Sequence, residues 1–344
     1  MRAIDSKALH AFSKALLLSS GLSDNDASLV AHHLVQTSLW GIDSHGVARL
    51  PHYLSRIEKG SINRRPEMKF QQGASSVGNL DGDHGLGIVV CTEAMRHAID
   101  LAKANGVGIV GVRNSSHCGA IGLYTRQACF EGFIGITFTH SDSFVVPHGG
   151  KKAFFGTNPI SIAIPSETID KSLCVDMATS VVPWNKIMNA RRDAISVPDD
   201  WGVDSHGERT TDPEKVVAVL PTAEHKGYAL AFLIDMLCGP LNGMPFGVHI
   251  PKMYENLEQN RMLGSVMIAI NPHCFFGGDT LKQSVQQAIK EVKSGNENIH
   301  YPGEPEYLAQ EVRSKKGIPV ELPLMEEFDS WAMKLGILPL SRTI

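Results

Sequence analysis

The chain has 344 residues, of which 43 % are apolar and 20 % charged, a balance typical of a globular protein with a large core. Its net charge is −4 and it has no long basic run, which argues against a nucleic-acid or anionic-membrane partner. No stretch approaches the ~18–20 uninterrupted apolar residues of a membrane helix, and the first residues lack the apolar core of a signal peptide.

The six cysteines are scattered along the chain and show no C-x-x-C spacing. In a chain of this length, that pattern favours reduced thiols that fill small spaces in the core. We therefore expect a cytoplasmic protein without disulfides.

The first 60 residues predict three helices. Residues 6–19 carry apolar side chains at helical spacing and stop at Gly21. Ser23 is a good N-cap for a second helix with acidic residues in its first turn. A third helix is expected to begin near Ser44 and to end at Gly60, with a bend at Pro51.

Strand-like and helical runs alternate after Pro66, with Gly or Pro at almost every junction. We expect strands at 68–71, 76–80, 107–112, 133–138, 160–164, 173–176 and 265–270, and helices at 87–104, 119–131 and 225–238. The stretch 240–264 is rich in Pro, Gly and Met and predicts a loop that lines a cleft or a subunit interface. Beyond Pro302 the pattern becomes helical again.

The sequence therefore predicts an α/β (α+β) protein with two domains. A helical domain is built from both ends of the chain, residues 1–70 plus 301–344. A sheet domain, residues 71–300, is inserted between these two parts.

One glycine motif is misleading. Residues 106–111 fit the pattern G-x-G-x-x-G, but the dinucleotide-binding fingerprint needs a strand before it and a helix after it. Here a predicted helix precedes the glycines and a strand follows them, so Gly106 is more simply a helix C-cap.

Ser44, His45 and Arg49 place a hydroxyl, an imidazole and a guanidinium within six residues. A guanidinium fork can hold a carboxylate through two parallel hydrogen bonds. Two plainer interpretations remain open: Ser44 as a helix cap, and His45 with Arg49 on a solvated helix face. Gly46 costs ~1 kcal/mol relative to Ala inside a helix, which suggests that a backbone approach requires it.

His117 lies between small residues in a predicted loop that joins a strand to a helix. Such loops carry much of the chemistry of α/β proteins, and an imidazole exchanges protons near neutral pH. The alternative is a buried histidine with its hydrogen bonds satisfied. No histidine has metal-ligand spacing, so we expect no metal site.

Lys226 opens the predicted helix 225–238, where a lysine beside free helix amides can hold a phosphate group. A solvated lysine is the plainer interpretation. The turn at 156–159 and the strand end at 176–179 carry only weak signals by themselves.

Taken in order, these pieces resemble the malate/L-lactate/sulfolactate dehydrogenase family over nearly the whole chain. The resemblance lies in Ser44-His45-Gly46 with Arg49, residues 114–119, 155–159, 176–179 and 225–227, and Pro302-Gly303-Glu304. The stretches 196–204, 210–213, 244–247 and 253–254 are most like one subgroup of the family.

The resemblance implies a non-Rossmann fold with a mixed, largely antiparallel sheet. It also implies a homodimer or higher homo-oligomer, with an active site between the domains and near the partner subunit. The cofactor would be NAD or NADP, lying extended across the sheet domain. We favour NAD, because no arginine cluster for a 2′-phosphate lies near the matching segments.

The resemblance also implies residue roles. His117 matches the catalytic histidine. The substrate-holding residues match Ser44, His45 and Arg49, and Tyr53 is a weaker candidate on the same side. The cofactor contacts match Ser141, Asp176, Met177, Ala178, Lys226, Pro302, Gly303 and Glu304. The sequence departs from the family at Cys118–Ile121, where a bulkier or aromatic residue is usual, so we expect one wall of the pocket to differ from that of the family.

The expected reaction is oxidation of a small 2-hydroxy acid, with Arg49 holding its carboxylate and His117 accepting its hydroxyl proton. The motifs do not choose among malate, lactate, sulfolactate, diketo sugar acids, cyclic imines and related substrates. Two alternatives from other classes are a histidine-based metal hydrolase and a non-catalytic binder of small molecules.

Overall fold

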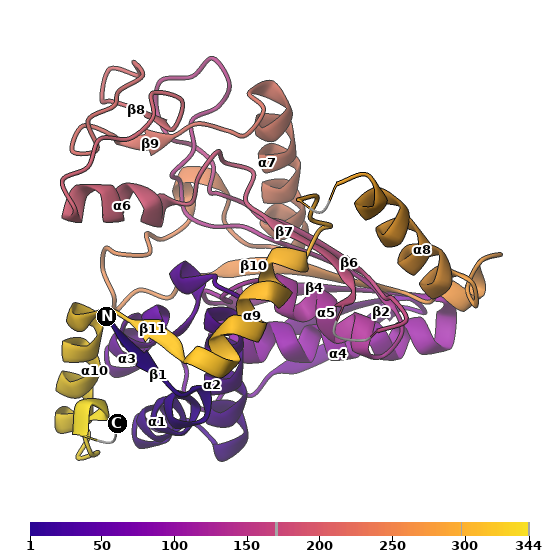
Figure 1. The fold of residues 1–344 in the computed structure, drawn as a ribbon, viewed down its shortest axis with the longest axis horizontal. Helices are drawn as coiled ribbons and strands as arrows, with labels where there is room; N and C mark the ends of the chain where they lie inside the picture. Colours follow the sequence, from indigo (N-terminus) through magenta and orange to yellow (C-terminus); the bar gives the residue numbers. More distant parts are fainter. Residues whose placement is uncertain (169–170, 297, 343–344) are drawn as a thin grey trace.

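The computed structural model describes residues 1–168, 171–296 and 298–342. A seven-stranded sheet forms its centre, in the order β2-β3-β4-β10-β5-β6-β7 (Figure 1). Its strands are β2 (Lys69–Ala74), β3 (Val77–Asp81), β4 (Val107–Ser115), β5 (Ile134–Thr139), β6 (Ile160–Ile164), β7 (Leu173–Met177) and β10 (Leu263–Ile270). Only β3 and β4 run parallel. The mixed, largely antiparallel sheet implied by the resemblance is therefore confirmed.

Helices cover both faces of this sheet. α4 (Gly87–Asn105) connects β3 to β4 and shares one apolar core with α5 (Gly122–Phe130), while α7 (His225–Cys238) lies across the opposite face (Figure 1). α4 ends at Gly106, whose φ of 82° is readily adopted only by glycine. The predicted C-cap is confirmed, and the glycines run on into β4 as the order of elements required.

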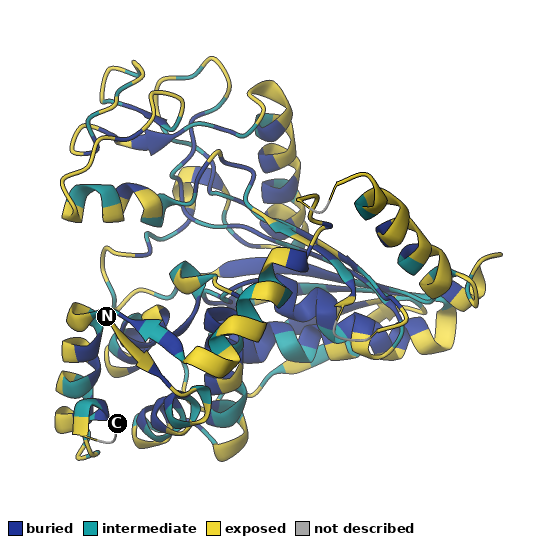
Figure 2. Cartoon of the chain, in the orientation of Figure 1, coloured by how far each residue is buried: buried dark blue, intermediate teal, exposed yellow. Residues whose placement is uncertain are grey.

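The helices from the two ends of the chain pack together below the sheet (Figure 1). They are α1 (Ser6–Ser19), α2 (Asp24–Leu39), α3 (Leu50–Glu58), α9 (Glu304–Lys316) and α10 (Leu322–Lys334). β1 (Arg2–Ile4) pairs antiparallel with β11 (Ile318–Val320). One buried cluster contains Leu9, Leu34 and Phe328, and its interior is dark blue in Figure 2. This shared core supports the predicted domain division, which we keep as a proposal because Leu86, Ile88 and Val89 also join the cluster.

Some elements differ from the sequence prediction. The third helix begins later, because Asp43–His45 and Val47–Arg49 form two separate 3-10 turns and α3 starts only at Leu50. Ser44 therefore caps no helix. Pro51 lies in the first turn of α3, where its missing N–H is not needed, so it does not bend the helix.

Several elements had no sequence prediction. They are the terminal strands β1 and β11 and also α6 (Trp184–Arg192), α8 (Leu281–Ser294), β8 (Gly202–Val203) and β9 (Ala218–Val219). α6, β8 and β9 form a small unit above the open end of the sheet (Figure 1). β8 and β9 have two residues each, too few for a periodic pattern. α6 and α8 are polar on average but amphipathic, so their helical periodicity was present in the sequence and was overlooked.

The six cysteines are free thiols, and all except the exposed Cys274 are buried. In the part of the chain that the structure describes, no helix combines the length and the apolar character needed to cross a bilayer.

Candidate functional site

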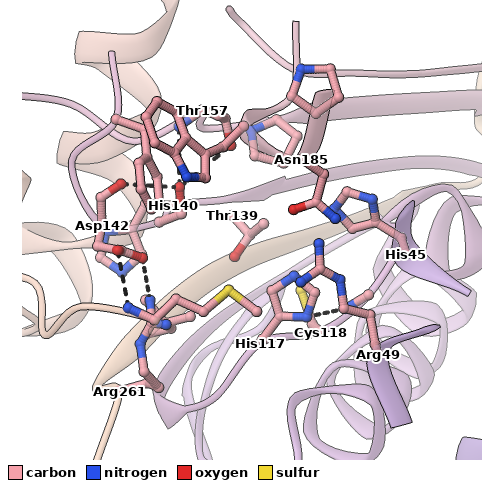
Figure 3. A pocket seen from close by; sticks show the side chains of 18 of the residues that line it. His45, Arg49, His117, Cys118, Thr139, His140, Asp142, Thr157, Asn185 and Arg261 are labelled. Carbon is pink, nitrogen blue, oxygen red and sulfur yellow. Dashed lines mark hydrogen bonds and ion pairs between the residues drawn. The ribbon is translucent and has the colours of Figure 1, made fainter. Parts of the chain in front are cut away.

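A cleft lies where the N-terminal helices meet the open end of the sheet. Its wall includes His45 and Arg49 from the 3-10 turns, His117 from the loop after β4, and Ser141 from the loop after β5. The predicted loop 240–264 contributes Met253, Tyr254 and Arg261, and α6 contributes Asn185. The prediction that the 240–264 loop lines a cleft is thus confirmed. Figure 3 shows His45, Arg49 and His117 together on one side.

Arg49 is the central charged residue of this side. Its side chain is only 7 % exposed, so the alternative of a solvated helix face is excluded. Nε donates to the carbonyl of Ser44 at 2.6 Å, and Nη1 donates to the Tyr254 hydroxyl at 2.8 Å. No carboxylate pairs with Arg49 within the described residues. The guanidinium therefore offers a positive charge and unspent donors to an anionic ligand.

Close packing fixes the turns that carry Arg49. A Cβ on Gly46 would lie 2.1 Å from Ser38 Oγ of α2, and Val47 N–H donates to the same oxygen at 3.0 Å. The backbone approach that Gly46 suggested is therefore real, and its partner is a helix. From the C-terminal side, Arg313 of α9 holds the Asp43 carboxylate through two bonds of 2.5 and 2.9 Å.

His117 lies at the predicted place, after β4 and before α5. Its Nδ1 is 2.7 Å from the Tyr53 hydroxyl, and Gly119 N–H points to the same nitrogen at 3.3 Å. The contacts at Nδ1 leave Nε2 for a ligand. Tyr53 is buried and does not line the cleft, so the structure places it behind His117 and away from the substrate side.

Neutral imidazoles surround Arg49. Burial, reinforced by the Arg49 charge, lowers the pKa of His45 to about 3 and lowers the pKa of His117 well below its usual value. The two rings stack with centroids 5.6 Å apart, and Ser44 Oγ is 2.9 Å from His45 Nδ1. Both imidazoles are therefore uncharged at neutral pH.

A second guanidinium lies in the opposite wall, and sequence reasoning missed it. Arg261 Nη2 bonds Asp142 Oδ1 at 2.6 Å, and both side chains are almost fully buried. The two residues are 119 positions apart, so no local pattern links them. The only signals available were the cleft-lining loop prediction for 240–264 and the strand end before Asp142.

An adjoining hollow contains part of the predicted cofactor set. It shares His45, Gly119 and Thr157 with the cleft and adds Ser44, Asp176 and Ala178. The Asp176 carboxylate accepts Gly122 N–H at 2.7 Å, and burial raises its pKa to about 6. Ser141 lines the cleft itself, as noted above.

The remaining predicted cofactor residues lie outside both hollows. Pro302 accepts a hydrogen bond from Cys174 N at 3.0 Å, which places the 302–304 turn beside β7. Glu304 pairs with Lys293 and His300. Met177 is partly exposed at the end of β7, and Lys226 is exposed at the start of α7. The structure thus brings only Ser141, Asp176 and Ala178 to the cleft region.

Metal ligation finds no support in residues 1–168, 171–296 and 298–342, where no cluster of three or more His, Cys, Asp or Glu side chains is placed to hold an ion.

Comparison with known proteins gives consistent matches over nearly the whole chain. A sequence profile described as malate/L-lactate dehydrogenase matches residues 4–329. The chain is 39 % identical to ureidoglycolate dehydrogenase (NAD(+)) of Escherichia coli K12 over 322 residues, 92 % of each chain. It is 36 % identical to malate/(S)-sulfolactate dehydrogenase of Methanothermus fervidus, over 94 % of this chain and 95 % of the relative.

Solved structures agree. Malate dehydrogenase from Pyrococcus horikoshii superposes with a TM-score of 0.89 at 33 % identity, covering 98 % of this chain and 97 % of that one. Sulfolactate dehydrogenase from Methanocaldococcus jannaschii gives a TM-score of 0.91 at 33 % identity, covering 99 % of each chain.

The buried neutral histidines predict acid sensitivity. Burial is the main reason why the pKa values of His33, His45 and His52 are lowered to about 3. The unfolded chain therefore binds more protons than the folded one below about pH 6.5, and stability falls as the pH drops toward 3.

Each such histidine adds about 1.4 kcal/mol per pH unit to that loss. His33 lies outside the cleft and its Nδ1 has no partner, so His33→Leu should reduce the slope of unfolding free energy against pH. Urea unfolding between pH 5 and 7 measures the slope. Equal slopes for the variant and the wild type would contradict the assignment.

Proposed function

The chain belongs to the malate/L-lactate dehydrogenase family, a family of hydroxy acid dehydrogenases, and on that premise we propose that it oxidises (S)-ureidoglycolate to oxalurate with NAD. The observation that carries the proposal is that Arg49, buried and without an acidic partner, lines the same cleft as His117. The substrate assignment is supported by the 39 % identity to a ureidoglycolate dehydrogenase, the subgroup that residues 196–204 and 253–254 resemble.

The cleft residues fit a nicotinamide cofactor. The Ser141 hydroxyl faces the cleft, and the Asp176 carboxylate faces the adjoining hollow, where a carboxylate can accept hydrogen bonds from ribose hydroxyls. The same carboxylate would repel a 2′-phosphate, which supports NAD over NADP. We keep Met177, Ala178, Lys226, Pro302, Gly303 and Glu304 as proposed contacts along β7 and the start of α7. When bound, the cofactor accepts the hydride from the carbinol carbon.

Arg49 would hold the substrate carboxylate. The guanidinium is fixed by Ser44 O and Tyr254 Oη, so little side-chain entropy is lost when a ligand binds. Neutral His45 and the Ser44 hydroxyl can donate or accept further hydrogen bonds beside it. This fixed geometry orients the carbinol toward His117.

His117 would accept the hydroxyl proton at Nε2. Its lowered pKa keeps the imidazole neutral and ready to act as a base at neutral pH. This role requires the tautomer in which Nδ1–H donates to the Tyr53 oxygen, so that the Gly119 N–H at 3.3 Å makes no hydrogen bond to Nδ1. The Tyr53 oxygen then stabilises the imidazolium that forms when Nε2 takes the proton. In the reverse direction the charged ring returns its proton to the alkoxide oxygen. Such proton transfer contributes roughly 10²–10⁴-fold to the rate.

A second candidate reaction is oxidation of malate or sulfolactate. Relatives with these names share about the same identity over the same length of chain, and they too are family members.

The first test of the proposal combines a substrate panel with the variant His117→Ala. The wild type should form NADH, measured by absorbance at neutral pH, fastest with (S)-ureidoglycolate. His117→Ala should lose about 10²–10⁴-fold in turnover but bind NADH normally, as measured by the fluorescence of the reduced nicotinamide. The absence of NADH with every hydroxy acid, or an unchanged turnover in the variant, would refute the proposal.

The second test concerns the clamp. Arg49→Lys keeps the charge but removes the planar fork, so kcat/KM should fall at least tenfold. Steady-state kinetics of the same oxidation measure this change. Arg96→Lys, which alters a guanidinium fork that binds Glu93 and Asp100 on the exposed face of α4, is the matched control and should retain most activity. Wild-type kinetics for Arg49→Lys would rule out bidentate binding.

We also propose that the chain forms a homodimer or higher homo-oligomer through α7. Leu230, Leu233 and Leu237 lie on one face of this helix and are 41 %, 60 % and 39 % exposed. An apolar stripe of this kind is typical of a surface covered by a partner, and the family resemblance implies that the partner is a second copy.

Leu233→Glu should therefore shift the protein toward monomers, because a charge would be buried in the interface. Analytical ultracentrifugation measures the shift. Met333 of α10 is similarly exposed, at 66 %, but stands apart from this stripe, so Met333→Glu is the control. The same sedimentation for both variants would exclude the α7 face as the interface.

A further inference from the structure

The wall opposite Arg49 points to a substrate with an uncharged polar tail. We propose that the Arg261–Asp142 pair selects an amide or urea group at this end of the substrate and rejects a second carboxylate. The inference deepens the proposed function and rests on it.

Arg261 and Asp142 are buried in the cleft wall and are held there by direct contacts. Figure 3 shows it on the side away from Arg49, His45 and His117. Arg261 is 2 % exposed and Asp142 is 1 % exposed, and their contact of 2.6 Å is one of the few ion pairs with both partners buried. The second Asp142 oxygen accepts Met253 N–H at 3.0 Å, so the carboxylate has a partner on each oxygen.

The charges of the pair cancel. Three charged side chains line the cleft, and Asp142 neutralises Arg261, which leaves Arg49 as the cation for the substrate carboxylate. Arg56 lies behind the wall and does not line the cleft. Its guanidinium donates to the backbone carbonyls of Lys252, Met253 and Gln259.

Asp142 cancels the charge of Arg261, but Arg261 still has N–H groups without hydrogen-bond partners. Nε and Nη1 of Arg261 are buried and have no hydrogen-bond partner. A carbonyl oxygen on the substrate tail would satisfy these N–H groups without bringing a second charge into the cleft. Neutral polar partners for tail N–H groups lie nearby (Figure 3): the Thr139 hydroxyl is between the two sides of the cleft, and Asn185, whose Oδ1 accepts from the Tyr254 hydroxyl, is on the His45 side.

A second carboxylate would be disfavoured there. It would lose its hydration, and the attraction of Arg261 would be offset by repulsion from Asp142. A methyl tail would leave the Arg261 donors unpaired, which is also costly in a buried site. The ureido group of ureidoglycolate carries a carbonyl acceptor and N–H donors and so matches this wall.

The sharpest test compares malate with malamate, in which an amide of the same size replaces the carboxylate farther from the hydroxyl group. The two tails have nearly the same size, and they differ in charge and in the NH₂ donor that the amide has in place of one carboxylate oxygen. The wild type should show a kcat/KM at least about tenfold higher for malamate. A preference for malate would overturn the proposal.

Asp142→Asn should shift this ratio toward malate by about tenfold or more, because Arg261 then keeps an uncancelled charge. General damage to the fold would lower kcat/KM for malate and malamate alike and leave their ratio unchanged. Asp235→Asn is the matched control: Asp235 is equally buried and accepts a loop N–H from Gly247, but it does not line the cleft. The proposal would be overturned if a folded Asp142→Asn variant kept the wild-type ratio of kcat/KM for malamate to kcat/KM for malate.

Calorimetric binding of succinamate and succinate repeats the comparison without turnover. Tighter binding of succinamate supports the pair as the selector even if Asp142→Asn does not fold, and tighter binding of succinate refutes it. The absence of NADH with any hydroxy acid would refute the proposed dehydrogenase function separately, since the binding comparison does not depend on hydride transfer.

Discussion

The hydrogen bond of 2.7 Å between the Tyr53 hydroxyl and His117 Nδ1 connects the two halves of the site. Tyr53 belongs to α3, which follows directly on the turns that carry Arg49, whereas His117 belongs to the loop between β4 and α5. One short contact therefore sets the clamp and the base at a fixed separation. The tight approach of Gly46 to α2 and the Arg313–Asp43 pair hold the same turns from two other directions. The rigidity of this arrangement is what allows a small substrate to be oriented by two groups.

Electrostatics adds a second constraint to the same place. A buried guanidinium beside several imidazoles keeps those rings neutral, because a further positive charge would be both desolvated and repelled. The neutrality of His117 suits a proton acceptor, and the charge of Arg49 stays available for an anion. The same burial makes the fold sensitive to acid, so the chemistry and the stability of the protein share one physical cause.

Local patterns predicted much of this protein, and long-range contacts account for what they missed. Gly106 as a C-cap and His117 between a strand and a helix follow from residues within a few positions of each other. Ser44 does not cap a helix, because Gly46 and its contact with Ser38 divide the segment into two 3-10 turns. Spacing alone left open whether Arg49 is solvated, and only tertiary packing shows its burial. The Arg261–Asp142 pair joins a loop near residue 260 to the end of β5, a pairing that one sequence does not contain.

The most direct test of the central claim is a crystal structure of the protein with NADH and oxalurate. We predict that the oxalurate carboxylate lies on the Arg49 guanidinium, with the keto oxygen within hydrogen-bonding distance of His117 Nε2. A carboxylate bound elsewhere, or a keto oxygen out of reach of His117 in every subunit, would contradict the account.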